Sequence, residues 1–368
     1  MHIPHVPASE ASYATMEAIG ACVSRCTVPE PPWSGGPPRK RLCACRPSSG
    51  QPASGSELEF SSTSEPSVCI HPQGLARSLE AVRRGRPLVQ CISNAVSVDI
   101  MANVLLATGM NAAMVSCERE AGEFAARAAA AVSINLGTPA ASDEWVRGTD
   151  AAVTAALAEG KPWVLDPVAL SASTWRYDRA TDLCRRRPTV VRLNASEAIA
   201  LAAVLVPHKS DRPNIAASPD ATHASLAAKP HAVAIARCLD TVVCVTGEVD
   251  LVTDGRRIIL VKNGVSGMRS ITALGCSLSS LVAGFVAVRC GRTNDSDDED
   301  GEAAGPAASV LEATAHATCF YGVCGEVAMT QGGAKGPGSL RAAFLDALAA
   351  VGPEELQSLA NMTLEVVA

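Results

Sequence analysis

The sequence predicts an α/β protein built on a mostly parallel sheet with helices on both faces. Two observations predict it: short apolar runs rich in β-branched residues recur along the chain, and Ala/Leu-rich stretches with helical spacing separate nearly all of them. Strands and helices that alternate in this way form three layers, helix on sheet on helix. The predicted strands are 87–92, 111–115, 131–135, 162–166, 188–193, 241–246 and a pair within 250–262, joined by a hairpin turn at "TDGRR".

The alternating pattern begins only near residue 71. Residues 1–70 are rich in Pro, Ser, Gly and Cys without a sustained period, which is typical of a disordered extension. Residues 71–368 are predicted to form one domain with two polar inserts, near 207–222 and 291–305. The second insert is strongly acidic, and we interpret it as a solvated loop.

Composition narrows the possible partners. The chain has 368 residues, is 48% hydrophobic and carries a formal charge of −6, so it can bury a large core. Its acidic balance argues against nucleic acid as the main partner. The longest uncharged apolar stretch, 277–288, is too short for a membrane span, and the N-terminus lacks the pattern of a secretory signal. We therefore expect a cytoplasmic protein with no membrane partner.

The fourteen cysteines are scattered through apolar runs and lack Cys-x-x-Cys pairs at zinc spacing. Free cysteine is often buried, so most of them are expected to be reduced core residues. A metal cluster of Cys22, Cys26, Cys43 and Cys45 is an alternative, although neither a histidine nor a second Cys pair completes it at the usual spacing.

Polar residues follow the predicted strands at their carboxyl ends. Ligands bind at this edge of an open α/β sheet, because each strand there leads into a loop and a helix N-terminus. Asp166 and Glu197 end consecutive strands and are expected to face one crevice, where their oxygens suit Mg²⁺. Helix capping is the alternative for Glu197, because Asn194 and Glu197 have the spacing of a capping box. Asp166 precedes a proline and has no simple capping role.

The turn "ITALGCSLSS" (271–280) fits the same plan. Gly275 and Cys276 precede an apolar helix, whose first free N–H groups favour negative charge and suit a transferring phosphoryl group. A thiol at a helix N-terminus is expected to have a lowered pKa, which makes Cys276 a candidate acceptor for the proton of an alcohol. The alternative role for Cys276 is a small buried residue at the start of the helix.

The chain contains eight motifs, which in order are "PLVQCISNAVSVDIMANVLLATGMNAAM", "SINLGT", "SDEWV", "GKPWVLDPV", "PTVVRLNASE", "VVCVTGEVDLVTDG", "ITALGC" and "GPGSLRAAFLDAL". In order and spacing they resemble the hydroxyethylthiazole kinases of thiamine salvage. The resemblance runs from about residue 75 to 360 and makes 71–368 the catalytic domain. It implies a ribokinase-like fold, a homotrimer, and transfer of the ATP γ-phosphate to the hydroxyl of 4-methyl-5-(2-hydroxyethyl)thiazole with Mg²⁺.

The resemblance also implies a role for each matching residue. Met114 matches the position whose backbone lies against the thiazole, and Asn94 and Ala273 match the substrate side of the site. Arg192 and Thr246 match the nucleotide contacts, for which a guanidinium fork and a hydroxyl donor are suited. Cys276, with Gly275 beside it, matches the cysteine that stands where related kinases place an aspartate base. The metal roles fall to Asp166 and Glu197.

Three departures from the family pattern leave alternatives open. The family turn Thr-Gly-Thr-Gly-Cys is Thr-Ala-Leu-Gly-Cys at 272–276, which costs on the order of 1–2 kcal/mol if Ala273 or Leu274 needs φ > 0. Residues 169–171 lack the family's glycines and are expected to narrow the approach to the metal. Cys91 replaces an asparagine beside the pocket. We favour the hypothesis of an active thiazole kinase. The alternatives are a catalytically weakened relative that binds thiazole or nucleotide, and a kinase of another small primary alcohol.

Overall fold

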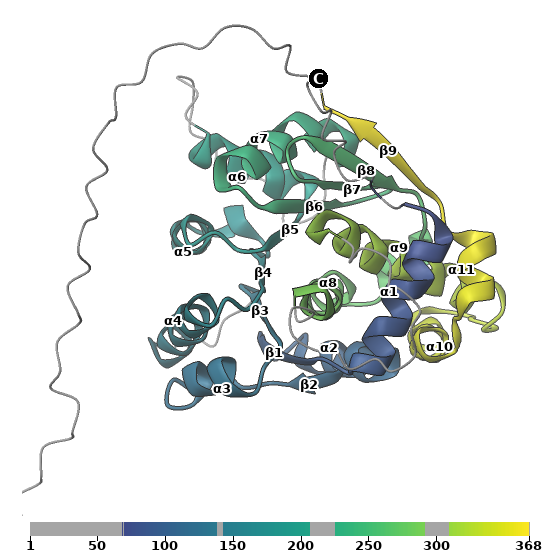
Figure 1. The fold of residues 1–368 in the computed structure, drawn as a ribbon, viewed down its shortest axis with the longest axis horizontal. Helices are drawn as coiled ribbons and strands as arrows, with labels where there is room; N and C mark the ends of the chain where they lie inside the picture. Colours follow the sequence, from purple (N-terminus) through teal and green to yellow (C-terminus); the bar gives the residue numbers. More distant parts are fainter. Residues whose placement is uncertain (1–67, 69, 138–142, 207–224, 291–308, 368) are drawn as a thin grey trace, which may run out of the picture. The chain divides into compact units, whose positions relative to one another are not determined.

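The structure is a computed structural model and describes residues 68, 70–137, 143–206, 225–290 and 309–367. Its strands are β1 (Leu88–Ile92), β2 (Asn111–Ala113), β3 (Ala131–Asn135), β4 (Trp163–Asp166), β5 (Val190–Asn194), β6 (Val242–Thr246), β7 (Asp250–Thr253), β8 (Arg257–Val261) and β9 (Met362–Val366). Within the described residues they form one nine-stranded sheet, in the order β2-β1-β3-β4-β5-β6-β7-β8-β9 (Figure 1). The pairs from β2 to β6 are parallel, and those from β6 to β9 are antiparallel.

Helices cover both faces of this sheet (Figure 1). One face carries α1 (Pro72–Gly85), α2 (Val98–Thr108), α8 (Leu274–Cys290), α9 (Val310–Thr330), α10 (Pro337–Ala350) and α11 (Pro353–Leu359). The other carries α3 (Ala121–Arg127), α4 (Asp143–Ala158), α5 (Thr174–Arg185), α6 (Ala195–Leu205) and α7 (Lys229–Leu239). The predicted three-layer α/β fold is confirmed.

Two apolar cores lie on the two faces of the sheet, and the alternation of side chains along each strand separates them. In β5, Val190 belongs to the core shared with α8 and α9, whereas Val191 and Leu193 belong to the core on the opposite face. The strands are apolar on both sides because both faces are covered. A polar residue at the carboxyl end of a strand, such as Arg192, therefore points toward α8 or away from it according to its position in this alternation.

The predicted strands agree with the structure to within a few residues, including the hairpin between β7 and β8. Strand β9 was not anticipated. Of the eight cysteines whose side chains are described, five are buried, as predicted, and no helix among the described ranges is long and apolar enough to cross a membrane. Several predicted features lie outside the described residues. They are the extension 1–70 (except Val68 and Ile70), the two polar inserts and the four-cysteine cluster.

Candidate active site

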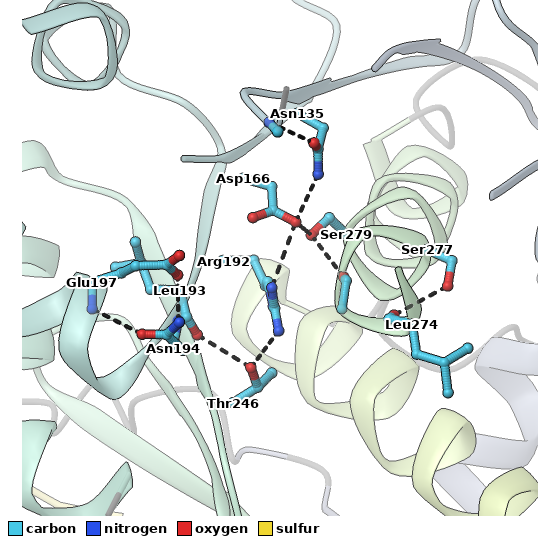
Figure 2. A network of polar contacts seen from close by, with 12 residues as sticks. Asn135, Asp166, Arg192, Leu193, Asn194, Glu197, Thr246, Leu274, Ser277 and Ser279 are labelled. Carbon is cyan, nitrogen blue, oxygen red and sulfur yellow. Dashed lines mark hydrogen bonds and ion pairs between the residues drawn. The ribbon is translucent and has the colours of Figure 1, made fainter. Parts of the chain in front are cut away.

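A continuous line of polar side chains crosses the carboxyl ends of neighbouring parallel strands (Figure 2). Asn94, just after β1, donates from Nδ2 to Oδ1 of Asn135 at 3.1 Å, and Asn135 Nδ2 donates to Oδ2 of Asp166 at 3.1 Å. Nη1 of Arg192 lies 3.6 Å from the same Asp166 oxygen, and Nη2 donates to Thr246 Oγ1 at 2.5 Å. Five strands thus contribute one polar group each to a connected row.

Strand alternation explains why these groups share a face. Asp166 lies two residues beyond Val164, and Arg192 lies two residues beyond Val190; both valines belong to the core on the α8 side. Ser279 of α8 meets the row and donates to Asp166 Oδ2 at 2.7 Å. The sheet therefore places the row under the first turns of α8.

Asp166 is the most enclosed member of the row, with no exposed surface. Its Oδ2 accepts hydrogen bonds from Asn135 and Ser279, whereas its Oδ1 is buried without a hydrogen-bond partner among the described residues. Burial raises the pKa of Asp166 to about 6, although the charge of Arg192 acts in the opposite direction. Above that pH the side chain is a buried carboxylate with one oxygen unpartnered.

Arg192 stays charged although it is largely buried. Burial acts against its positive charge, but the negative charges of Asp166 and Glu197 outweigh this effect and raise its pKa. The guanidinium packs against Gly275: a Cβ on that glycine would lie 2.6 Å from Nη2 and 2.8 Å from Nη1. A fixed positive charge therefore lies beside the start of α8.

The altered turn keeps a regular helix start. The first helical bond of α8 runs from Ser277 N to the carbonyl of Ala273, at 3.0 Å, so the N–H groups of residues 274–276 precede it. Ala273 has φ 61°, in the left-handed region, so one of the two replaced positions does need φ > 0. Leu274 is helical and 6% exposed, so its side chain points into the core rather than into the site.

The expected lowering of the Cys276 pKa is wrong. Burial, helped by the negative charge of Asp166, raises the pKa of the Cys276 thiol to about 12, even though Arg192 and a hydrogen bond from Asn135 act to lower it. The resting side chain is therefore a neutral thiol that lies close to the polar row.

Glu197 caps α6, as the alternative interpretation proposed. Its Oε2 accepts from the backbone N–H of Asn194 and its Oε1 from that of Ala169, both at 2.8 Å. The Asn194 side chain accepts in turn from Glu197 N, which completes a capping box. Glu197 is near enough to Asp166 to raise the pKa of that group. It therefore borders the row while both of its oxygens hold backbone groups.

The turn after β4 differs from the expectation for residues 169–171. Ala169 is left-handed, with φ 55°, and Glu197 holds its N–H. Leu170 has no exposed surface and packs into the core on the α4–α7 face, so its side chain does not narrow the approach to Asp166. This part of the expectation is wrong because the short 3₁₀ helix at Leu170–Ala172 turns the leucine inward.

On the substrate side, Asn94 joins the row directly, whereas Met114 does not. Met114 follows β2, the neighbour of β1, so it lies at the same edge of the sheet and is half-buried against the core. Cys91 is 1% exposed and belongs to the core, so its replacement of asparagine does not alter a pocket wall. The hypothesis that the substrate is a different alcohol, which was based on Cys91, therefore has no support in the structure.

Two members of the site were not predicted, Asn135 and Ser279. Asn135 lies in the polar strand end "NLGT", which marked the region without singling out the residue. Its Oδ1 accepts from both Asn94 and the N–H of Gly137, so its amide NH₂ must face Asp166. Ser279 is one of several small residues in an apolar helix, and nothing in its neighbourhood in the sequence distinguishes it.

The described residues contain no group of three or more His, Cys, Asp or Glu side chains that could hold a metal ion. The donor set is instead one buried carboxylate with a free oxygen, Asp166, beside a second carboxylate, Glu197, that is occupied by backbone groups. Such a sparse set fits Mg²⁺, which keeps water and substrate phosphates among its ligands.

This edge of the parallel sheet holds a buried carboxylate, a fixed arginine and a helix N-terminus, an arrangement that suits an α/β enzyme acting on phosphate groups. Comparison with known proteins gives the family. Residues 79–354 match the model of the hydroxyethylthiazole kinase family. The chain belongs to this family.

Individual relatives agree. Hydroxyethylthiazole kinase from Cereibacter sphaeroides (strain ATCC 17029) is 45% identical over 289 residues, which cover 78% of this chain and 98% of that protein. The Zea mays enzyme of the same name is 41% identical over 286 residues, 78% of this chain and 91% of that protein.

Solved structures extend the likeness to the fold. The hydroxyethylthiazole kinase protein of Pyrococcus horikoshii OT3 is 31% identical with a TM-score of 0.66, covering 80% of this chain and 99% of that one. Pyridoxal kinase from Staphylococcus aureus, in complex with AMP-PCP and pyridoxal, is 13% identical with a TM-score of 0.50, covering 76% and 99%. At that identity it shows a shared fold alone. The likeness to the Pyrococcus horikoshii protein agrees with the predicted α/β fold of parallel sheet and covering helices.

Proposed function

We propose that this chain transfers the γ-phosphoryl group of ATP to the hydroxyl of 4-methyl-5-(2-hydroxyethyl)thiazole, the salvage step of thiamine synthesis. The observation that carries this proposal is the connected row of polar side chains from Asn94 to Thr246. Within this row, Arg192 lies against Gly275 in the first turn of α8. Membership of the hydroxyethylthiazole kinase family supports ATP and the thiazole alcohol as the two substrates.

The chain's own groups account for charge stabilisation in the transfer. The transferring phosphoryl group develops negative charge on its oxygens, and preorganised donors act on it at no reorganisation cost. The N–H groups of residues 274–276 and the Arg192 guanidinium are such donors, and they meet at Gly275. Arg192 also holds Thr246, so the two proposed nucleotide contacts form one unit.

Asp166 would hold Mg²⁺ through Oδ1, the carboxylate oxygen that has no partner in the described part of the chain. Glu197 would assist through a bound water, because each of its oxygens already accepts a backbone N–H. When bound, Mg²⁺ neutralises charge on the phosphates. Asn135 and Ser279 hold Asp166 Oδ2 through hydrogen bonds, which would leave Oδ1 for the cation.

The thiazole alcohol would bind at the β1–β2 end of the row. Asn94 Oδ1 accepts from Val96 N, and its amide donates to Asn135, so the Asn94 side chain is fixed. Met114 would present its backbone to the ring and Ala273 would line the same side. Cys276 would accept the proton of the hydroxyl in its thiolate form, a minor species because the resting thiol is neutral.

The assembly would be a homotrimer with the thiazole site near a subunit boundary. Met114 directly follows β2, which is an edge strand of the sheet, and Val96, two residues after Asn94, is 59% exposed. The edge of β2 beside Met114, unpaired within the described residues, leaves this side of the site open to a second subunit. Light scattering on the purified protein measures the mass, and a monomer at assay concentration contradicts this assembly.

One assay tests the activity. Purified protein, ATP, Mg²⁺ and the thiazole alcohol should give the thiazole phosphate and ADP in equal amounts, and Cys276→Ala should give much less. Arg127→Ala is a matched control, because Arg127 lies on the exposed surface of α3 and pairs only locally with Glu123. No turnover above that of Cys276→Ala contradicts the proposed function.

A second candidate, a weakened relative, has one observation in its favour. Ala273 and Ala169 are both left-handed where the family pattern has glycine, at the two turns beside Asp166. The combined change Ala273→Gly with Leu274→Thr should raise kcat at least tenfold if the turn is impaired. An unchanged kcat argues against impairment.

A further inference from the structure

Ala273 has a left-handed backbone at the point where the chain enters α8. A residue with a Cβ keeps this conformation only where its surroundings hold it, because the Cβ crowds the following carbonyl. The side chain of Ala273 is a single methyl group, so it can make few contacts that would fix this backbone conformation. The neighbouring residues must therefore supply the contacts that fix the turn.

A buried triangle of hydrogen bonds fixes the next residue, Leu274. Tyr321 Oη, from α9, lies 2.9 Å from the Leu274 carbonyl oxygen and 2.7 Å from Ser277 Oγ, and Ser277 Oγ lies 3.1 Å from the same carbonyl. The two hydroxyls supply two hydrogens for three contacts, so at least one of them donates to the Leu274 carbonyl whichever way they are oriented. We call these three residues the Tyr321 clamp.

The clamp is buried. Tyr321 is 4% exposed and Ser277 has no exposed surface. The Tyr321 ring packs against Phe344 of α10 with ring centroids 4.8 Å apart and planes at 75°, an edge-on contact. The Leu274 side chain is buried in the same core. The start of α8 is therefore tied to α9 and, through Phe344, to α10.

We propose that Tyr321 and Ser277 are positioning residues for phosphoryl transfer, which keep Ala273 left-handed by holding the Leu274 carbonyl. This inference rests on the proposed kinase activity. The turn at Ala273 sets the direction of the N–H groups of residues 274–276, which lie beside Arg192. In this chain a tyrosine anchor does what the flexibility of glycine does in the family pattern.

The direct test removes both hydroxyls with Ser277→Ala and Tyr321→Phe, the second of which keeps the ring and its contact with Phe344. We expect kcat to fall about tenfold while the KM for the thiazole alcohol stays within about twofold, because donors that act in the transition state are displaced. Thr314→Val is the control: it removes a buried α9 hydroxyl that bonds only within its own helix, to Val310 O. A double variant with wild-type kcat overturns the proposal.

A rescue experiment separates positioning from general damage. Adding Ala273→Gly to the double variant should return kcat to within about threefold of the Ala273→Gly single variant, because glycine adopts φ > 0 without support. A packing defect would not respond to this change. Equal losses with alanine and with glycine at position 273 overturn the proposal.

A measurement without substrates distinguishes this proposal from the kinase assignment. Amide hydrogen exchange at Ser277, whose N–H bonds to the Ala273 carbonyl, should be faster in Tyr321→Phe than in wild type, and slow again when Ala273→Gly is added. Unchanged exchange overturns the clamp even if the wild-type protein is an active kinase. Faster exchange supports the clamp even if another alcohol proves to be the substrate.

Discussion

The guanidinium of Arg192 and the backbone of Gly275 are in direct contact, with no room for a methyl group between them. Arg192 comes from β5 and Gly275 from the first turn of α8, so two sources of positive potential meet at one point. Glycine is required at position 275 for this close approach and not for an unusual backbone conformation. The other turn residues are free to differ where only their N–H groups are used.

Gly275→Ala should lower kcat by about 10²-fold, because the new Cβ pushes the guanidinium away from Thr246 and Asp166. Steady-state kinetics with ATP and the thiazole alcohol measure this. Gly338→Ala is the control, since a Cβ at Gly338 in α10 meets no atom within 4 Å. A Gly275→Ala protein with more than half of the wild-type kcat would show that the contact is dispensable.

Asn135→Ala should lower the free energy of unfolding more than Ser279→Ala does. Both changes remove a donor to Asp166 Oδ2, but only the first also leaves Asn94 Nδ2 and Gly137 N without their acceptor. We expect a loss of about 1–3 kcal/mol in unfolding free energy for Asn135→Ala, and a lower kcat in both. Urea denaturation and kinetics measure the two effects. Asn103→Ala, on the exposed part of α2, serves as the control, and an order reversed between the two variants contradicts this ranking.

The pH dependence of kcat reports on Cys276. Its pKa of about 12 means that the thiolate fraction rises about tenfold per pH unit between pH 7 and 9 without levelling off. Because the thiolate is the proposed proton acceptor, kcat should rise with pH over this range. Cys276→Ala should show a low rate that does not follow this rise. A plateau at neutral pH in the wild-type protein would mean that sulfur does not take the proton.

Ala169→Gly should stabilise the protein by up to about 1 kcal/mol, because glycine removes the cost of the left-handed conformation. Ala203→Gly should have the opposite sign and cost about 1 kcal/mol, since Ala203 is exposed in the right-handed helix α6. Urea titration of both variants checks the pair. A destabilised Ala169→Gly would indicate that the turn after β4 carries no strain.

The sheet, its two covered faces and the edge that carries the site were predictable from the sequence. Alternating apolar runs determine these features, and parallel strands place Asp166, Arg192 and Thr246 at one edge whatever their separation along the chain. The metal and nucleotide roles stay predictions, because the described contacts establish proximity and not ligand binding. The capping role of Glu197 was visible as a spacing of three residues from Asn194.

The rest depends on contacts between residues far apart in the sequence. Ser279 reaches Asp166 across 113 residues, and Tyr321 reaches Leu274 across 47. The raised pKa of Cys276 could not be foreseen either, because its burial and the nearby charge of Asp166 arise only from tertiary packing. Local spacing carries none of this information, which exists only once α8 and α9 have packed on the sheet.

The left-handed turn at Ala273 has a consequence for how such loops are recognised. A site made of backbone N–H groups is encoded in torsion angles, so the letters at its positions can change while the shape persists. A sequence search that requires the letters Gly-Thr-Gly-Cys would miss this chain. A search that also accepts a buried tyrosine on a neighbouring helix in place of the missing glycine would find it. Compensating residues outside the loop are then part of the signature of the loop itself.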